Sequence, residues 1–155
     1  SNNKLILGRE EWGSAITAIL AKEPTQKIDI KNSFNESTKQ LTVDVTVKYL
    51  TAGSVDDNLT VYFIEDSLAS WQVDYSKEPE HDVANYVHHH VLRAAITPTF
   101  GEQLSTTAIS AATTFKKSYT YTLKDTYIPR HCSVVAFINN KTSNEISQAV
   151  EKSIQ

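Results

Sequence analysis

The chain has 155 residues, 40% of them hydrophobic, and its 15 Lys and Arg against 18 Asp and Glu give a net charge of −3. This composition suggests one globular domain with a core and excludes disorder for most of the chain. The charge footprint of a nucleic-acid binder is missing, the apolar stretches are too short for a bilayer-spanning helix, and a single cysteine excludes an internal disulfide.

An amphipathic helix is predicted near the start of the chain, over residues 9–22. Its large apolar residues recur at helical spacing, namely Trp12, Ile16, Ile19 and Leu20. Pro24 ends this helix. We therefore assign residues 1–24 to a helical lead-in, which could be the end of a preceding domain, and residues 25–155 to a β domain.

Beyond the helix, the hydrophobic period changes to two, which indicates strands. Residues 40–50 (QLTVDVTVKYL) alternate strictly, as a strand with one buried and one wet face does. Similar reasoning predicts strands over residues 27–34, 59–65, 114–124 and 133–139. Residues 145–154 fit a helix or a strand, and the short polar turn before them favours a hairpin and hence a strand.

The middle of the chain, residues 76–113, has the weakest pattern. Residues 88–96 fit either a strand or a helical turn, and residues 98–112 have the polar composition of a loop. About seven strands and one leading helix predict an all-β fold, an immunoglobulin-like antiparallel β-sandwich. Because strands do not alternate with helices, a doubly wound parallel sheet is excluded.

Three consecutive histidines raise the possibility of a metal site. On a strand, His88 and His90 would point to the same face and could bind a metal together. The alternative is that both are half-exposed strand histidines, because a metal site needs three or four convergent ligands and the spacing links only two.

Signatures of catalysis are missing from the sequence. Cys132 follows His131 directly, and neighbours on a strand point to opposite faces, which favours a core cysteine over an activated nucleophile. The sequence has no G-x-S-x-G elbow, H-E-x-x-H motif or phosphate-binding glycine loop. We therefore predict that the protein is not an enzyme and requires no cofactor.

Aromatic residues offer a candidate ligand-binding surface. Trp71, Tyr75 and Tyr86 could form a stacking platform for a sugar or a peptide, although aromatic residues on strands more often belong to the core. Trp71 is the best candidate for an exposed ring, since we expect it to lie beyond the end of the strand over residues 59–65.

Three phrases, taken in order, resemble one known family. They are DNLTVYFIEDS at residues 57–67, YVHHHVLR at residues 86–93, and VVAFINN followed by EISQAV at residues 134–140 and 145–150. Together they resemble the outer-membrane lipoprotein family of about twenty-eight kilodaltons from Porphyromonas and Bacteroides, over residues 28–150. The middle histidine of the second phrase is usually another residue in that family, so only His88 and His90 match it.

The resemblance implies a lipidated protein of the bacterial outer membrane whose carboxy-terminal domain is this sandwich. Membrane attachment would then come only from a lipid anchor upstream. The family is similar to surface antigens and suspected adhesins or receptors, which implies a non-catalytic interaction domain with a protein or glycan partner at the cell surface. We expect residues 76–113 to form a long recognition loop. The alternatives are a structural or hydrolytic metal site at His88 and His90, and carbohydrate binding through Trp71.

Overall fold

Three strands form the first sheet of the structure, a computed structural model that describes residues 7–77 and 79–155. They are β1 (Gln26–Asn35), β2 (Gln40–Tyr49) and β8 (Thr114–Thr122), in the order β1-β2-β8, and both pairings are antiparallel. The central strand β2 buries one face completely, with Leu41, Val43, Val45, Val47 and Tyr49. The alternation predicted for this segment is therefore confirmed.

The second sheet has the order β10-β9-β3-β6, and a short strand, β7, also pairs with β3. Its strands are β3 (Asp57–Glu65), β6 (Val91–Ala95), β7 (Glu102–Gln103), β9 (Cys132–Asn140) and β10 (Ile146–Ser153). Because β3 has a partner on each side, nearly all of its residues are buried. The last segment is a strand in a hairpin with β9, as predicted.

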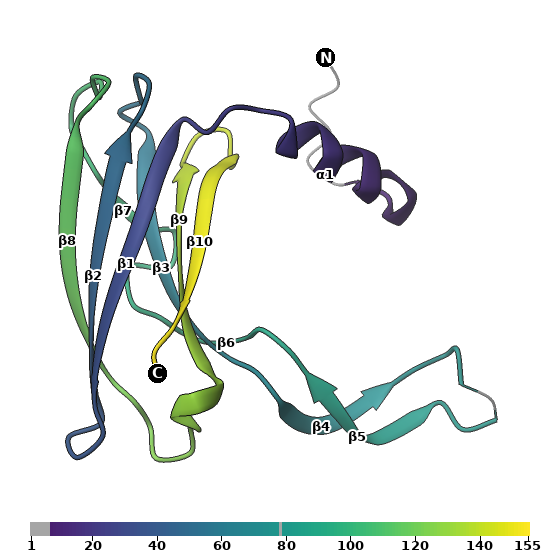
Figure 1. The fold of residues 1–155 in the computed structure, drawn as a ribbon. Coiled ribbons are helices and arrows are strands. Elements are labelled where there is room, and N and C mark those ends of the chain that lie inside the picture. The colour runs from purple at the N-terminus through teal and green to yellow at the C-terminus, as the bar shows by residue number, and fades with distance from the viewer. Residues whose placement is uncertain (1–6, 78) are drawn as a thin grey trace.

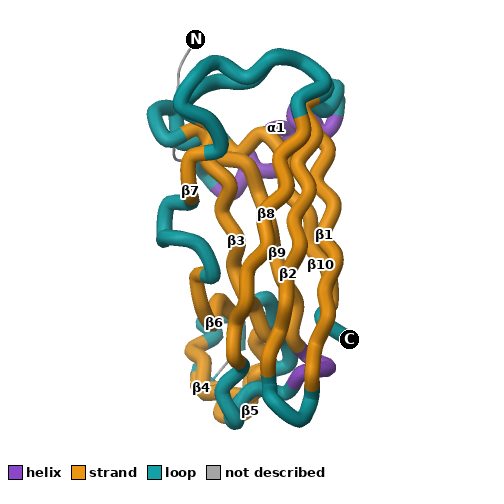
Figure 2. Tube along the Cα trace, turned by 90° about the vertical axis from the view of Figure 1, so that its left-hand side faces the viewer, coloured by secondary structure: helices purple, strands orange, loops and turns teal. Residues whose placement is uncertain are grey.

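The two sheets pack face to face and meet along β1 and β10 (Figures 1 and 2). At this seam the Asn32 side-chain amide donates to the Ser153 carbonyl oxygen over 3.0 Å. Inside, the ring of Phe63 lies 5.0 Å from that of Tyr121 and 5.6 Å from that of Tyr127. An all-β antiparallel sandwich with one N-terminal helix is confirmed.

The expectation of one long loop over residues 76–113 is wrong. This segment contains β5 (Asp82–His88) as well as β6 and β7, and a further strand, β4 (Leu68–Val73), precedes it. The structure thus has ten strands among its described residues, not about seven. β4 and β5 pair only with each other and form a projecting two-stranded arm, residues 68–88 (Figure 1).

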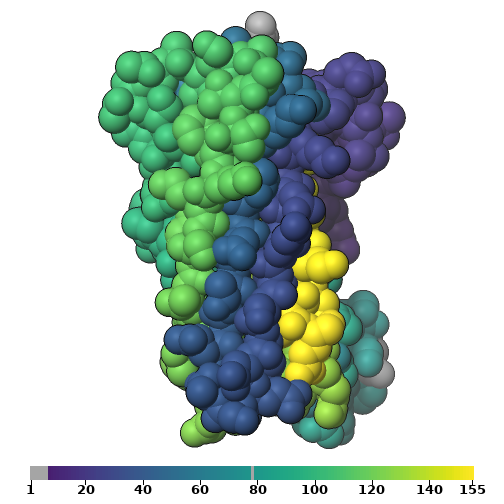
Figure 3. Space-filling model, turned by 60° about the vertical axis from the view of Figure 1, so that its left-hand side comes forward, coloured from purple at the N-terminus to yellow at the C-terminus, as the bar shows by residue number. Residues whose placement is uncertain are grey.

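The helix lies outside the sandwich. A short 3₁₀ turn, η1 (Arg9–Glu11), leads into α1 (Trp12–Leu20), close to the range predicted. None of its residues is buried. Both α1 and the arm project from the side of the sandwich that carries the second sheet, one near each end (Figure 1). In the space-filling view they protrude behind the broad surface formed by β8, β2 and β1 (Figure 3).

Candidate interaction surface

The two outer faces of the sandwich differ in chemistry. On the first sheet, the outward positions of β1 and β2 alternate with the buried ones and carry charged and hydroxyl side chains. They are Lys27, Asp29, Lys31, Thr42, Asp44, Thr46 and Lys48. β8 continues this surface with Lys116, Ser118 and Thr120. This face is therefore of the kind that water solvates without a partner.

The outer face of the second sheet is apolar instead. Tyr62 and Phe137 point outward from β3 and β9, with ring centroids 5.3 Å apart in an edge-to-face contact. Phe100 and Ile146 line the same shallow hollow as these two rings and leave 82% and 55% of their surface in water. Leu92 on the neighbouring strand β6 is 56% exposed. Large apolar side chains on an outward sheet face, next to one another, indicate a surface that is covered by something else.

Exposed apolar residues gather on this side of the molecule. Eleven of the fifteen exposed large hydrophobic residues among the described ones lie on α1, the arm or the second sheet's outer face. They are Trp12, Ile16, Ile19, Leu20, Trp71, Tyr75, Tyr86, Val87, Leu92, Phe100 and Ile146. We call this set the apolar side. Because none of the eleven comes from the first sheet, the exposure is concentrated, not scattered.

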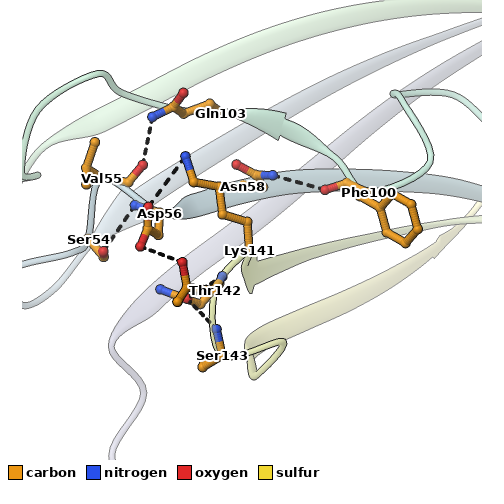
Figure 4. Close-up of polar contacts among 10 residues, drawn as sticks. Ser54, Val55, Asp56, Asn58, Phe100, Gln103, Lys141, Thr142 and Ser143 are labelled. Atoms are coloured by element: carbon orange, nitrogen blue, oxygen red, sulfur yellow. Dashed lines mark hydrogen bonds and ion pairs between the residues drawn. The ribbon is translucent and has the colours of Figure 1, made fainter.

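Phe100 is held in its exposed position by its neighbours. The Asn58 side-chain amide donates to the Phe100 carbonyl oxygen over 3.0 Å (Figure 4). The Gly101 N–H donates to the Pro98 carbonyl oxygen over 2.7 Å. Gly101 has a φ of +81°, and a Cβ there would lie 2.5 Å from the Thr60 hydroxyl oxygen. Only glycine can occupy this position so close to Thr60. The contact fixes the backbone next to Phe100 and so holds its ring in solvent.

A polar network braces the same end of the sandwich. Asp56 lies 3.4 Å from the Lys141 ammonium and accepts a hydrogen bond from the Thr142 hydroxyl over 2.9 Å (Figure 4). The Gln103 side chain donates to the Val55 carbonyl oxygen over 2.8 Å. These contacts join the β2–β3 turn to the β9–β10 turn and to β7, so the edge near Phe100 is crosslinked.

The arm leaves and rejoins the sandwich through two residues in the left-handed region. Ser67 has a φ of 60° and His90 a φ of 53°, both unusual for residues other than glycine. Asp66 holds the two ends together, because its carboxylate accepts from the His90 N–H over 2.5 Å. Its own N–H donates to the His131 carbonyl oxygen over 2.8 Å. The base of the arm is therefore tied to the body of the domain.

A buried ion pair that the sequence reasoning missed lies next to this base. Glu65 ends β3 with no exposed surface, and its Oε2 is 3.2 Å from Arg93 Nε. Its Oε1 accepts from the Ile128 N–H over 2.8 Å, and the Arg93 guanidinium stacks 4.6 Å from the centroid of the Tyr127 ring. The β3–β6 pairing shifts register at Arg93, and such a bulge re-aims a side chain.

The three aromatic residues singled out from the sequence all lie on the arm. Trp71 lies beyond the end of β3, in the further strand β4, and it is 56% exposed. Tyr75 follows β4 and packs its ring 5.2 Å from that of His81, while Tyr86 in β5 lies 4.9 Å from the ring of His88. Whether they bind a sugar or a peptide stays a prediction.

His88 and His90 do not share a strand. β5 ends at His88, and His90 lies in the turn before β6, where its positive φ breaks the alternation on which a shared face depends. The His90 ring lies instead between two carboxylates, 3.5 Å from Asp66 and 3.3 Å from Glu151. Within residues 7–77 and 79–155, no group of three His, Cys, Asp or Glu side chains is placed to hold a metal ion.

Cys132 lies in the core, 1% exposed, at the start of β9. Its thiol donates to the Ile128 carbonyl oxygen over 3.2 Å. Burial, together with the nearby Glu65 carboxylate, raises the pKa of the thiol to about 12. A thiol in this environment stays protonated at neutral pH and is a poor nucleophile.

Comparison with known proteins identifies a family and several solved structures of similar fold. The family model described as outer membrane protein Omp28 matches residues 3–155. Among solved structures, a domain of the outer membrane lipoprotein Omp28 from Porphyromonas gingivalis superposes with a TM-score of 0.58. It is 19% identical, and the match covers 86% of this chain and 91% of that one, so the likeness shows the fold. No curated protein matches the sequence.

Proposed function

Because the chain belongs to the Omp28 family of outer membrane proteins, we propose that it is a non-catalytic interaction domain whose apolar side binds a protein partner. The membership confirms the resemblance found in the sequence phrases and the outer membrane location that it implied. Attachment through an upstream lipid anchor, and a role as adhesin or receptor at the cell surface, are part of the same proposal.

The observation that carries this proposal is the concentration of exposed apolar residues on one side. Protein interfaces bury a central cluster of aromatic and aliphatic side chains inside a polar rim. Phe100, Tyr62 and Phe137 supply such a centre, and the crosslinked turns around Asp56 supply a rim. The fixed backbone at Gly101 means that little ordering is required when the Phe100 ring meets a partner.

Site-specific photocrosslinking in cells tests the proposal. A benzophenone amino acid replaces Phe100 or Leu92 on the apolar side, and Thr120 on the opposite face of the sandwich serves as the matched control. Discrete covalent adducts are expected from the first two positions only. Adducts of equal yield from Thr120, or none from either face, would contradict the assignment of the partner surface.

A second measurement decides where the partner must be sought. Protease treatment of intact cells removes a domain that faces the medium and spares one that faces the periplasm. Loss of the domain without lysis would favour an adhesin or receptor with a partner outside the cell. Protection until lysis would refute the adhesin reading and leave an envelope protein as the partner.

Glycan binding through the arm is a second candidate function. It is favoured by one observation, the presence of Trp71, Tyr75 and Tyr86 as exposed rings on the same two strands. Exposed aromatic rings stack on the apolar faces of sugars. Retention on a glycan array should then fall in a Trp71→Ala variant, while unchanged retention would remove this candidate.

A further inference from the structure

The helix α1 exposes a purely apolar surface. Its nine residues include no charged side chain, and Trp12, Ile16, Ile19 and Leu20 are 55–79% exposed. Their spacing of four, three and one places them on one face of the helix. Charged residues flank α1 in the described sequence, and one of them, Lys22, pairs with Glu145 at 3.7 Å.

The polar side chains of α1 are satisfied by the backbone next to them. The Ser14 hydroxyl donates to the Glu11 carbonyl oxygen and the Thr17 hydroxyl to the Gly13 carbonyl oxygen, each over 2.9 Å. The Trp12 indole N–H donates to the Leu7 carbonyl oxygen over 3.4 Å. The helix thus presents no side-chain hydrogen that requires an outside acceptor, as apolar surroundings demand.

A helix of this kind is not stabilised by its own sequence. Isolated helices below about 12 residues are marginal in water, and α1 contains Gly13, Thr17 and two isoleucines, which are weaker helix formers than alanine or leucine. Its apolar face must therefore be covered for the helix to persist. Protein interfaces usually pair polar groups across the contact, and α1 offers none.

We propose that α1 lies in the lipid–water interface of the membrane, with Trp12, Ile16, Ile19 and Leu20 among the acyl chains. The chain belongs to a family of outer membrane proteins, so a lipid surface lies close to it. Acyl chains accommodate apolar side chains and form no hydrogen bonds with them. Trp12 at the start of the helix matches the preference of tryptophan for the membrane–water interface. No described helix is long and apolar enough to cross a membrane, and α1, about 14 Å long, lies in the surface plane.

The contact rests on family membership and on α1 alone. It assigns α1 to lipid and leaves the rest of the apolar side, the arm and the outer face of the second sheet, to the protein partner proposed above. It would fix the orientation of the sandwich relative to the lipid. The arm and the second sheet face would then be presented at a set height above the membrane.

Flotation with lipid vesicles tests this inference. The 155-residue chain, carrying no lipid, is mixed with vesicles of phosphatidylethanolamine and phosphatidylglycerol, and the bound fraction is measured. The protein is expected to float with the vesicles. Because α1 is uncharged, raising the salt concentration or replacing phosphatidylglycerol by phosphatidylcholine should change the bound fraction less than about twofold.

Variants separate α1 from the rest of the apolar side. Ile16→Asp/Ile19→Asp should lower the partition coefficient more than about tenfold, because two buried apolar groups are replaced by charges. Leu92→Asp, which changes an equally exposed apolar residue on the second sheet, should float like the unchanged protein. Circular dichroism of each variant confirms that the sandwich is folded.

Tryptophan emission reports the contact directly. In a Trp71→Phe background the only indole is that of Trp12, and its emission should shift to the blue when vesicles are added. Absence of flotation, or flotation that the two aspartates leave unchanged, would overturn the inference. So would a loss of dimer mass in Ile16→Asp/Ile19→Asp without vesicles, since a second copy would then be the cover.

Discussion

Replacing Arg93 by alanine should destabilise the domain through the carboxylate that it leaves behind. Glu65 is inaccessible to water, and the guanidinium of Arg93 lies 3.2 Å from its carboxylate and supplies a counter-charge. Removing one partner of a buried ion pair costs about 3–5 kcal/mol, because the remaining charge stays desolvated. In the variant the Ile128 N–H still donates to the Glu65 carboxylate. We therefore expect a loss at the lower end of this range, about 3 kcal/mol.

Chemical denaturation measures this cost. The free energy of unfolding from urea titrations at pH 7, followed by circular dichroism, should fall by about 3 kcal/mol in Arg93→Ala. For a chain of this size the melting temperature should fall by about 6–12 °C. Lys48→Ala, an exposed lysine on the first sheet, is the control and should change the free energy by less than about 0.5 kcal/mol.

A double variant tests the cause. Glu65→Leu/Arg93→Met removes both charges and keeps most of the volume, so its stability should lie within about 1 kcal/mol of the unchanged protein. The reasoning is refuted if Arg93→Ala loses less than about 1 kcal/mol, or if the double variant is as unstable as the single one.

Three further outcomes follow from the core and the histidines. Burial holds the pKa of the Cys132 thiol at about 12 against an ordinary value of 9.0, so stability from the protonated thiol is complete below pH 9 and is lost as pH rises towards 12. Urea midpoints measured between pH 8 and pH 11 should decline less steeply in Cys132→Ala. Tyr49→Phe should lower the free energy of unfolding by about 1–2 kcal/mol, because it removes the hydroxyl that donates to the buried Asp57 carboxylate over 3.0 Å. The hydrogen bond from the Ser54 N–H to the same carboxylate remains, and thermal melts measure the difference. Zinc should leave the melting temperature unchanged, because β5 ends at His88 and His90 lies outside it. If zinc instead raises the melting temperature, and alanine at both positions abolishes this rise, the two histidines do bind the metal.

The sandwich was predictable where burial is one-sided or complete. In β2, Val43, Val45 and Val47 alternate with polar residues because one face meets the core and the other meets water. The arm escaped prediction for the opposite reason. Strands β4 and β5 have no core beneath them, so no face had to be apolar and the period-two signal never formed.

Sequence patterns also do not show what an exposed face contacts, or which side chains meet across strands. The periodicity of α1 indicated an apolar face correctly, but a sequence pattern does not tell whether such a face packs within its own domain or against something else. The Glu65–Arg93 pair depends on a bulge that turns Arg93 toward the end of β3, and this requires the β3–β6 register. For Trp71, exposure was expected from its position beyond the strand over residues 59–65 and is found, although the projecting strand β4 that carries it was not predicted.

The arm is fixed in place more firmly than its exposure suggests. A two-stranded hairpin alone is marginally stable in water, and this one carries Trp71 and Tyr86 into solvent. Yet both of its ends are bound at the sandwich, by Asp66 across the base and by the buried Glu65 pair beside it. A pre-ordered arm loses little conformational entropy when a partner covers it. Restraints at the base combined with apolar exposure at the strands are therefore the arrangement expected of a binding element, and they support the choice of this side of the molecule as the partner surface.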